Sequence, residues 1–208
     1  LEMGIKDFRV LDAISQVPRH IFLDEALRSR AYENRSLSIG YKQTISQPYI
    51  VAKMTELLIS HTKSRGKVLG NVLELGSGCG YQSAVLSYFS EQVFAVERIK
   101  PLIHKAREHL VELKINNVLF KYGDGFLDWD KNISYDGILC AAAPRQYPQE
   151  LVESLSNDSK IVIPVGDNKF QQLNVITKIS KNEIKEELHD EVAFVPMLSG
   201  TSIDGNDS

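Results

Sequence analysis

The feature that most restricts the fold is an alternation of short apolar runs with helical stretches through the middle of the chain. The runs are rich in β-branched and apolar residues and lie at 71–75, 92–97, 117–122 and 135–142. Helical patterns over 81–89 and 101–113 come between them. Strands that alternate with helices form βαβ units, whose strands lie parallel and whose helices cover both faces of the sheet. The sequence therefore predicts an α/β fold with a mostly parallel, twisted sheet.

The flanking regions have different patterns. Before the alternating region, apolar residues at helical spacing predict helices over 5–16 and from Tyr49 onward, with a short helix in "IFLDEALRSRAY" between them. The stretch "ENRSLSIGYKQTISQP" has no periodicity and is interpreted as a polar connection. After the alternating region, "KIVIPV", "QQLNVITKIS" and "EVAFVPML" predict late strands, at least one of them antiparallel. The charged run "KNEIKEELHDE" is interpreted as a solvated connection.

Length and composition fit one globular domain, because 208 residues that are 43% hydrophobic can bury a sizeable core. We expect three parts: an N-terminal helical segment over 1–66 that carries the substrate-side loop, an α/β core over 67–200, and a flexible tail over 201–208. The 24 basic and 27 acidic residues lack the basic excess of a nucleic-acid-binding protein.

No apolar run approaches the roughly 18 residues of a membrane span. The two cysteines, and an N-terminal sequence without the apolar core of a signal peptide, favour a reducing compartment. We expect a cytoplasmic monomer that binds neither nucleic acid nor a membrane.

A glycine-rich turn follows the first predicted strand, in "VLELGSGCGYQSAVL" (72–86). Gly76, Gly78 and Gly80 let the backbone turn sharply and approach a ligand, because no Cβ stands in the way. A phosphate-binding P-loop needs a lysine after the turn, and a dinucleotide fingerprint needs Gly or Ala in place of Tyr81. An esterase elbow needs serine in place of Gly78. The turn fits none of these sites, and a purely structural turn stays open.

Carboxylates follow the next two predicted strands at the same edge of the sheet. Glu97 ends the second strand, about 20 residues after the glycine turn, where a carboxylate can bind ribose hydroxyls. The third strand ends in Gly123, Asp124 and Gly125. A turn that avoids phosphate, together with two carboxylates, predicts a nucleoside, and S-adenosyl-L-methionine fits best. Glu74, inside the first strand, either faces the amino end of that cofactor or pairs with a lysine or arginine.

Ser46 stands in "TISQPYIVAKMTELL" (44–58), directly before an apolar helical run. Serine is a preferred N-cap and Pro48 suits a first turn, so the local pattern favours a helix cap. A helix start is also a good place to bind a carboxylate. Contact with a substrate is therefore compatible with the cap and stays open.

Several segments resemble the motifs of protein-L-isoaspartate O-methyltransferases, and together they cover nearly the whole chain. Those in the predicted core are "VLELGSGCGYQ", "VERI", "GDG", "YDGILCAAAP" and "PVG…QQL". Those outside the cofactor core are "VPRHIFL" (17–23), "IGYKQTISQPYIVAKMTELL" (39–58) and "VAFVPML" (192–198). The glycine turn is shared by many methyltransferases, whereas "QTISQP" and "VPRH" are particular to this family. Cys79 is a departure, because another small residue is expected there.

The resemblance implies a Rossmann-like class I methyltransferase fold that binds S-adenosyl-L-methionine at the strand ends and releases S-adenosyl-L-homocysteine. It implies a protein-L-isoaspartate(D-aspartate) O-methyltransferase, a cytoplasmic repair enzyme that acts on isoaspartyl-containing proteins and peptides. Such enzymes methylate the free carboxylate of L-isoaspartyl residues. The ester then collapses to a succinimide, which reopens partly to normal aspartate.

The resemblance also assigns site residues by motif match. Ser46 corresponds to the active-site serine, and the substrate-side residues are Ser46, Phe194, Val195 and Pro196. We expect the cofactor to be bound by Thr44, Ile45, Glu74, Gly76, Ser77, Gly78, Gly80, Glu97, Arg98, Gly123, Asp124 and Gly125.

The expected chemistry needs little proton transfer, because a carboxyl with a pKa near 4 is already ionised at neutral pH. The site has to align the reacting atoms and exclude water, and we assign the Ser46 hydroxyl to orienting the carboxylate. The five histidines show no metal-binding spacing, so no metal site is expected. A methyltransferase with another acceptor and a non-catalytic S-adenosyl-L-methionine-binding module are the alternative functions.

Overall fold

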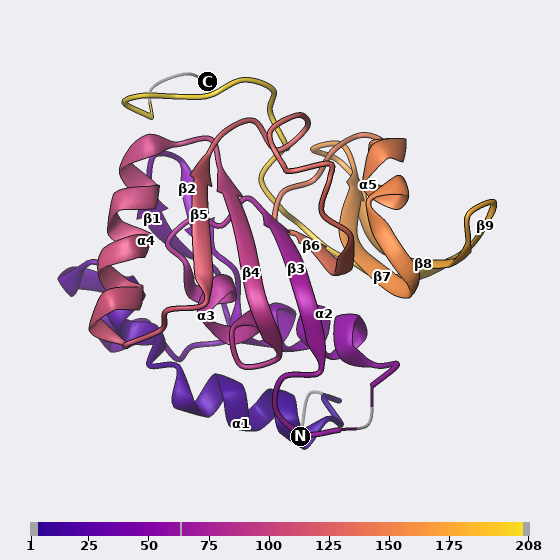
Figure 1. Cartoon of the computed structure of the whole chain (residues 1–208). Coiled ribbons are helices and arrows are strands. Elements are labelled where there is room, and N and C mark those ends of the chain that lie inside the picture. The colour runs from indigo at the N-terminus through magenta and orange to yellow at the C-terminus, as the bar shows by residue number, and fades with distance from the viewer. Residues whose placement is uncertain (1–3, 63, 206–208) are drawn as a thin grey trace.

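A seven-stranded sheet forms the centre of the structure, a computed structural model that describes residues 4–62 and 64–205 (Figure 1). The strand order is β5-β4-β3-β6-β7-β8-β9, and the first five strands in this order run parallel. These parallel strands are β3 (Leu69–Leu75), β4 (Ser90–Glu97), β5 (Val118–Tyr122), β6 (Tyr135–Cys140) and β7 (Leu155–Gly166). The predicted α/β fold with a mostly parallel sheet is confirmed.

Helices and loops cover both faces of this sheet, because side chains along a strand point alternately to opposite sides. Val72 and Leu139 belong to a buried cluster with residues of the first four α-helices. Leu73 and Ile138, their neighbours in sequence, belong to a second cluster with Trp129 and residues of α5. The helices are α1 (Phe8–Gln16), α2 (Pro48–Ile59), α3 (Tyr81–Leu86), α4 (Lys100–Glu112) and α5 (Gln149–Glu153).

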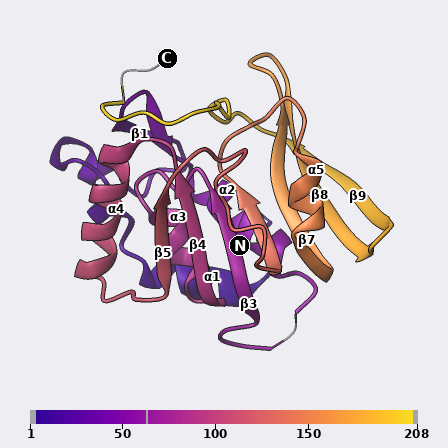
Figure 2. The same ribbon diagram turned by 45° about the horizontal axis from the view of Figure 1, so that its top comes forward.

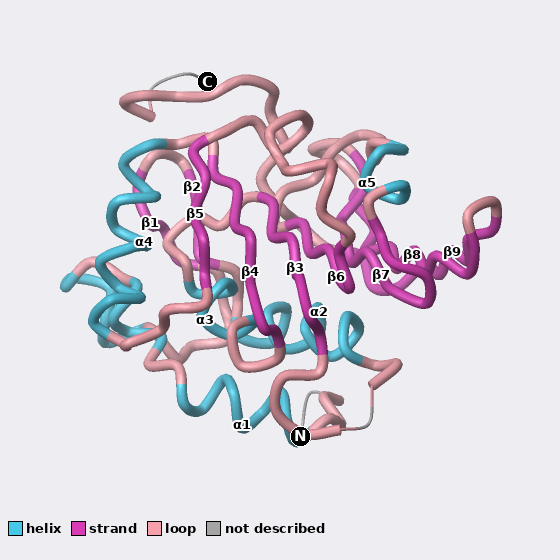
Figure 3. Tube along the Cα trace, viewed as in Figure 1, coloured by secondary structure: helices cyan, strands magenta, loops and turns pink. Residues whose placement is uncertain are grey.

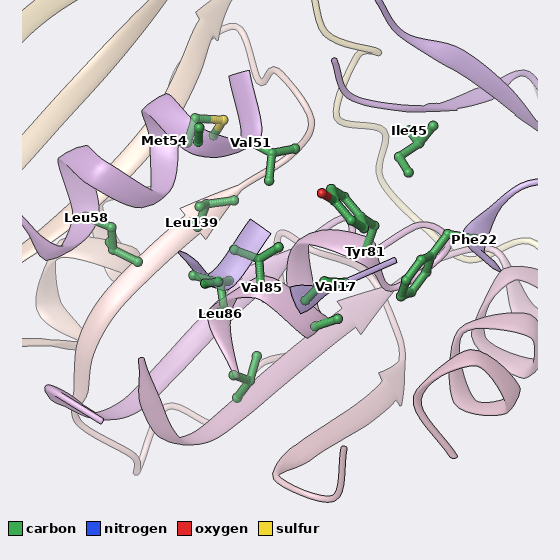
Figure 4. Close-up of a cluster of buried hydrophobic side chains, with 14 of the residues drawn as sticks. Val17, Phe22, Ile45, Val51, Met54, Leu58, Tyr81, Val85, Leu86 and Leu139 are labelled. Atoms are coloured by element: carbon green, nitrogen blue, oxygen red, sulfur yellow. The ribbon is translucent and has the colours of Figure 1, made fainter. Parts of the chain in front are cut away.

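Helix α2 is held by the apolar face that its sequence predicts. Val51, Met54 and Leu58 are at most 2% exposed and gather with Leu139 of β6 in one cluster (Figure 4). Full burial of one such side chain stabilises the fold by roughly 1.5–3 kcal/mol. The helix is therefore fixed on the sheet, and so is the segment that leads into it.

The N-terminal region contains elements that the sequence patterns did not indicate. The supposed polar connection forms a small two-stranded antiparallel sheet of β1 (Leu37–Gly40) and β2 (Gln43–Ile45), separate from the main sheet (Figure 3). The short helix expected after Pro18 is instead two 3-10 helices, Arg19–Phe22 and Glu25–Arg30. Strands this short show too few alternating positions to be recognised in a sequence.

The late part of the sheet contains antiparallel pairs, which confirms the prediction of at least one antiparallel strand, but two other predictions for this region were wrong. Strand β8 (Gln171–Ser180) pairs with β7 and with β9 (Glu183–Glu191), which is the charged run interpreted as a connection. An edge strand needs backbone pairing on one side only, and its charged side chains stay in water. The following stretch, "EVAFVPML", is not a regular strand and makes a single bridge, between Pro196 and Ala143.

The C-terminal segment packs against the loop after β4 and crosses the edge of the sheet (Figures 1 and 2). Ser202 is fully buried; its N–H donates to the Arg98 carbonyl at 2.7 Å, and its own carbonyl accepts from Lys100 N–H at 3.0 Å. Ser202 is therefore anchored to the loop after β4, inside the range 201–208 that was predicted as a flexible tail. Residues 206–208 lie outside the described residues.

The chain order of the strands reverses between β3 and β6, which are neighbours in the sheet. Ligands of open α/β sheets bind at such a switch point, beyond the carboxyl ends of the strands. Within the described residues, no helix has both the length and the apolar character to cross a bilayer.

The replacement Gly80→Ala tests the turn between β3 and α3. Gly80 has φ +87°, and an added Cβ would lie 3.0 Å from the Cβ of Ala106 on α4. We expect a loss of about 1–3 kcal/mol in unfolding free energy, measured by urea denaturation. Gly66→Ala is the matched control, because Gly66 has φ +80° and open space around it. Equal losses in both variants would show that contact with α4 is unimportant.

Candidate active site

A cleft of about 960 Å³, its open mouth included, lies at the carboxyl ends of β3, β4 and β6 and is called the main cleft here. The turn after β3, the loop after β4, Ala141 and Ala142 after β6, the β2–α2 junction and the segment 194–198 line it. The residues predicted for the site that line it are Thr44, Ile45, Ser46, Glu74, Gly76, Ser77, Gly78, Glu97, Arg98, Gly125, Phe194, Val195 and Pro196.

A second cleft adjoins the main cleft and is called the outer cleft. Its walls come from the β2–α2 junction on one side and from residues 191–195 on the other, with Ser36 and Ala141. The residues that line both clefts are Thr44, Ser46, Ala141, Phe194 and Val195. Ser46 is therefore exposed to two adjoining spaces, which is the arrangement a group-transfer reaction between two ligands needs.

Ser46 is not the cap of α2. The N-cap residue is Gln47, which makes no capping bond with its side chain. The carboxamide oxygen of Asn34, from the loop before β1, instead accepts the Tyr49 N–H at 3.0 Å. The helix-cap prediction is wrong, because tertiary folding supplies another acceptor. None of the hydrogen bonds recorded for the described residues uses the Ser46 hydroxyl, so it is free to bind a ligand.

The Glu97 carboxylate joins the glycine turn to the loop after β4. Its two oxygens accept the Gly78 N–H at 2.8 Å and the Ile99 N–H at 2.9 Å. Burial raises the pKa of Glu97, and these backbone N–H groups oppose the rise. Each carboxylate oxygen can accept a further hydrogen bond, so Glu97 remains able to bind hydroxyl groups in the main cleft.

Glu74 is fully buried beneath the main cleft, and no lysine or arginine pairs with it among the described residues. One of its oxygens accepts the Ser83 hydroxyl, and the other has no partner. Burial raises the pKa of Glu74 to about 8. The ion-pair alternative is therefore wrong, and an unpartnered acceptor faces the space where a cationic group could bind.

Three of the predicted cofactor contacts, Gly80, Gly123 and Asp124, are not among the residues that line the main cleft. Gly80 packs against α4. The Asp124 carboxylate accepts the Phe126 N–H at 2.7 Å and the Gly200 N–H at 2.6 Å, so it anchors the C-terminal segment. The spacing of acidic residues after strands could not reveal this, because Gly200 reaches Asp124 only in the folded chain.

Cys79 also lines the main cleft, but its thiol is not activated. Burial raises the pKa of Cys79 to about 11, so its thiol stays protonated at neutral pH. The neighbouring Tyr81 is buried, and its ring lies 5.0 Å from the Arg19 guanidinium carbon. Arg19 of the "VPRH" motif thus supports the wall of the cleft through a cation–π contact.

Sequence reasoning missed a further set of lining residues. They lie within the quoted motifs, but their apolar side chains gave no sign of a role, and only the fold brings them together: Val51, Met54, Leu75, Val96, Ile99, Ala141, Ala142, Met197 and Leu198. Ala141 and Ala142 had one usable signal, since they directly follow β6 at the switch point. Among the described residues, no group of three or more His, Cys, Asp or Glu side chains could hold a metal ion.

Comparison with known proteins identifies the family. The family model described as "Protein-L-isoaspartate(D-aspartate) O-methyltransferase (PCMT)" matches residues 2–202. The chain belongs to this family. A protein-L-isoaspartate O-methyltransferase from Methylobacillus flagellatus is 50% identical over 204 residues, which are 97% of this chain and 89% of the relative. A second relative, protein-L-isoaspartate O-methyltransferase 1 from Marinobacter nauticus, is 48% identical over 96% of this chain and 88% of its own length.

Solved structures agree with the family. A Plasmodium falciparum protein assigned as a protein-L-isoaspartate O-methyltransferase, in complex with S-adenosyl-L-homocysteine, is 26% identical. It superposes with a TM-score of 0.78 over 93% of this chain and 92% of its own. Another protein-L-isoaspartate O-methyltransferase, 24% identical, shares the fold with a TM-score of 0.82 over 94% of this chain and 62% of its own. The fold is the Rossmann-like fold of class I methyltransferases.

Glu74 makes the stability of the ligand-free protein depend on pH. The ordinary pKa of its carboxyl is 4.5, and burial raises this pKa to about 8 in the folded protein. The protonated form therefore stabilises the fold fully below the unfolded-state pKa, and this contribution is lost as the pH rises through about 8. We expect Glu74→Gln to reduce the fall in unfolding free energy between pH 5 and 8, measured by urea denaturation without ligand. Parallel curves for variant and wild type would contradict this ionisation.

Proposed function

We propose that this chain is a protein repair methyltransferase, which transfers a methyl group from S-adenosyl-L-methionine to the free carboxylate of L-isoaspartyl residues. The observation that carries the proposal is the position of Ser46 on both clefts with an unengaged hydroxyl. Family membership over residues 2–202 supports the same reaction.

The main cleft fits S-adenosyl-L-methionine by its chemistry. When bound, this cofactor supplies an electrophilic methyl group on a positively charged sulfur. Glu97 would accept hydrogen bonds from the ribose hydroxyls with its remaining lone pairs. The unpartnered oxygen of Glu74 would accept from the amino group. Gly76, Ser77 and Gly78 would lie against the cofactor, since they line the cleft between these two carboxylates.

The outer cleft fits the isoaspartyl residue and its peptide. Ser46 would donate its hydroxyl hydrogen to the substrate carboxylate and hold one oxygen toward the main cleft. The backbone of Phe194 and Val195 would hold the substrate chain on the opposite wall, since both residues line both clefts. The carboxylate is ionised at neutral pH, so these residues position it and no side chain has to remove a proton.

The natural partners would be aged proteins and peptides that contain isoaspartate. We infer a cytoplasmic setting, because the free cysteines Cys79 and Cys140 are buried as thiols and form no disulfide. A monomeric state and the absence of nucleic-acid partners stay predictions.

Labelled S-adenosyl-L-methionine and two matched peptides test the reaction. We expect the isoaspartyl peptide to acquire a base-labile methyl ester and the aspartyl peptide to remain unlabelled, because the outer cleft selects the rearranged backbone. Equal labelling of both peptides would contradict the repair function. Cofactor binding in a calorimeter with no transfer to any peptide would favour the non-catalytic binding module.

The replacement Ser46→Ala tests the role of the hydroxyl. We expect kcat/KM for the isoaspartyl peptide to fall at least about tenfold, the effect of losing one hydrogen bond to a charged group. The melting temperature should stay close to that of wild type, because Ser46 caps no helix. Ser60→Ala, at the other end of α2, is the control and should keep full activity. Unchanged activity in Ser46→Ala would remove Ser46 from the mechanism.

A further inference from the structure

Gln171, the first residue of β8, is only 5% exposed, and both polar atoms of its side chain form hydrogen bonds to the same residue. Its carboxamide oxygen accepts the Phe194 N–H at 2.7 Å, and its carboxamide nitrogen donates to the Phe194 carbonyl at 3.0 Å. Its own backbone carbonyl accepts the Val192 N–H at 3.0 Å. A side chain thus provides the pair of hydrogen bonds that a neighbouring strand normally provides.

The segment held in this way forms one wall of both clefts. Phe194 and Val195 line the main cleft and the outer cleft, and Pro196 lines the main cleft. Regular pairing with β8 stops at Glu191. Beyond that point the backbone partners of residues 194–197 are the Gln171 side chain and Ala143, which bonds to Val195 and Met197 at 2.8 Å each.

We propose that Gln171 is a positioning residue for the substrate: its side chain sets the backbone of Phe194 and Val195 in the register that binds the isoaspartyl peptide. The proposal rests on the proposed function and adds a residue that touches neither cleft, since Gln171 is absent from both linings. The backbone bonds of the described residues leave the Val195 N–H without a partner. Gln171 holds the backbone at Phe194, and Ala143 holds it at Val195 and Met197. Fixed at both points, the segment presents the Val195 N–H to the substrate.

A buried amide suits this task better than an apolar or charged side chain. It matches one donor and one acceptor of the same residue at once, and it leaves no charge in a dry environment. Removing it would leave two backbone groups of Phe194 unpaired, which is unfavourable unless the segment moves toward water. The expected consequence is a wall that shifts, and therefore weaker binding of the peptide rather than a changed methyl-transfer step.

The test compares Gln171→Met with Gln172→Met in the full chain. Gln172 is the matched control, because its side chain also donates to a backbone carbonyl, that of His189 at 3.1 Å, but away from both clefts. We expect Gln171→Met to raise KM for the isoaspartyl peptide about tenfold or more, the effect of losing hydrogen bonds at the wall. The kcat should change much less, and Gln172→Met should keep the wild-type KM.

Gln171→Glu adds a measurement, the pH dependence of kcat/KM, that a merely structural role would leave unchanged. An ionised carboxylate would face the Phe194 carbonyl and repel it, whereas a protonated carboxyl restores one donor and one acceptor. We expect the ratio of kcat/KM in this variant to that in wild type to rise as the pH falls from 8 to 6. Burial raises the pKa of a carboxyl into or toward this range.

Amide hydrogen exchange of residues 192–198 gives a result independent of catalysis, and we expect faster exchange there in Gln171→Met but not in Gln172→Met. A KM in Gln171→Met equal to that in Gln172→Met, with an active wild type, would overturn the positioning role and leave the proposed function intact. A flat pH ratio in Gln171→Glu would overturn it too. A wild type that methylates neither isoaspartyl nor aspartyl peptide would remove the proposed function, and this inference with it.

Discussion

The buried carboxylate of Glu97 is the interaction on which the site depends. By accepting the Gly78 and Ile99 N–H groups, it ties the glycine turn after β3 to the loop after β4. Two loops that would otherwise move separately thus share one anchor at the edge of the sheet. Burying a carboxylate is costly without hydrogen bonds, so these backbone donors are a condition for its presence. The same group is available to a nucleoside because its oxygens retain unused lone pairs.

The two walls of the outer cleft come from opposite ends of the chain, and polar side chains fix each of them. Asn34 caps α2 from a distance and leaves Ser46 free, whereas Gln171 holds Phe194 as a strand would. Methyl transfer to an ionised carboxylate requires alignment more than proton transfer. A site of this kind gains from rigid walls, and the amide side chains of Asn34 and Gln171 supply rigidity without adding charge near the reacting groups.

Local patterns predicted the elements whose side-chain periodicity is long enough to be recognised. The parallel strands, α2 and α4 follow such patterns. The β1–β2 pair did not, because strands of three and four residues show almost no alternation. Strand β9 was missed for another reason. It is an edge strand that pairs with β8 through its backbone, and this pairing does not require apolar side chains. The segment 192–198 has the composition of a strand, yet its backbone pairing with β8 ends after the Val192 N–H.

The sequence alone determined the fold class, the glycine turn, the carboxylate at the end of β4 and the motifs that indicate the family. Each of these is a local matter of residue type and spacing. Only the tertiary structure decided that Ser46 is not a cap, that Asp124 holds Gly200 rather than lining the main cleft, and that Glu74 has no basic partner among the described residues. The reason is that a polar group takes the partner that folding brings within reach, and such partners lie far away in the chain.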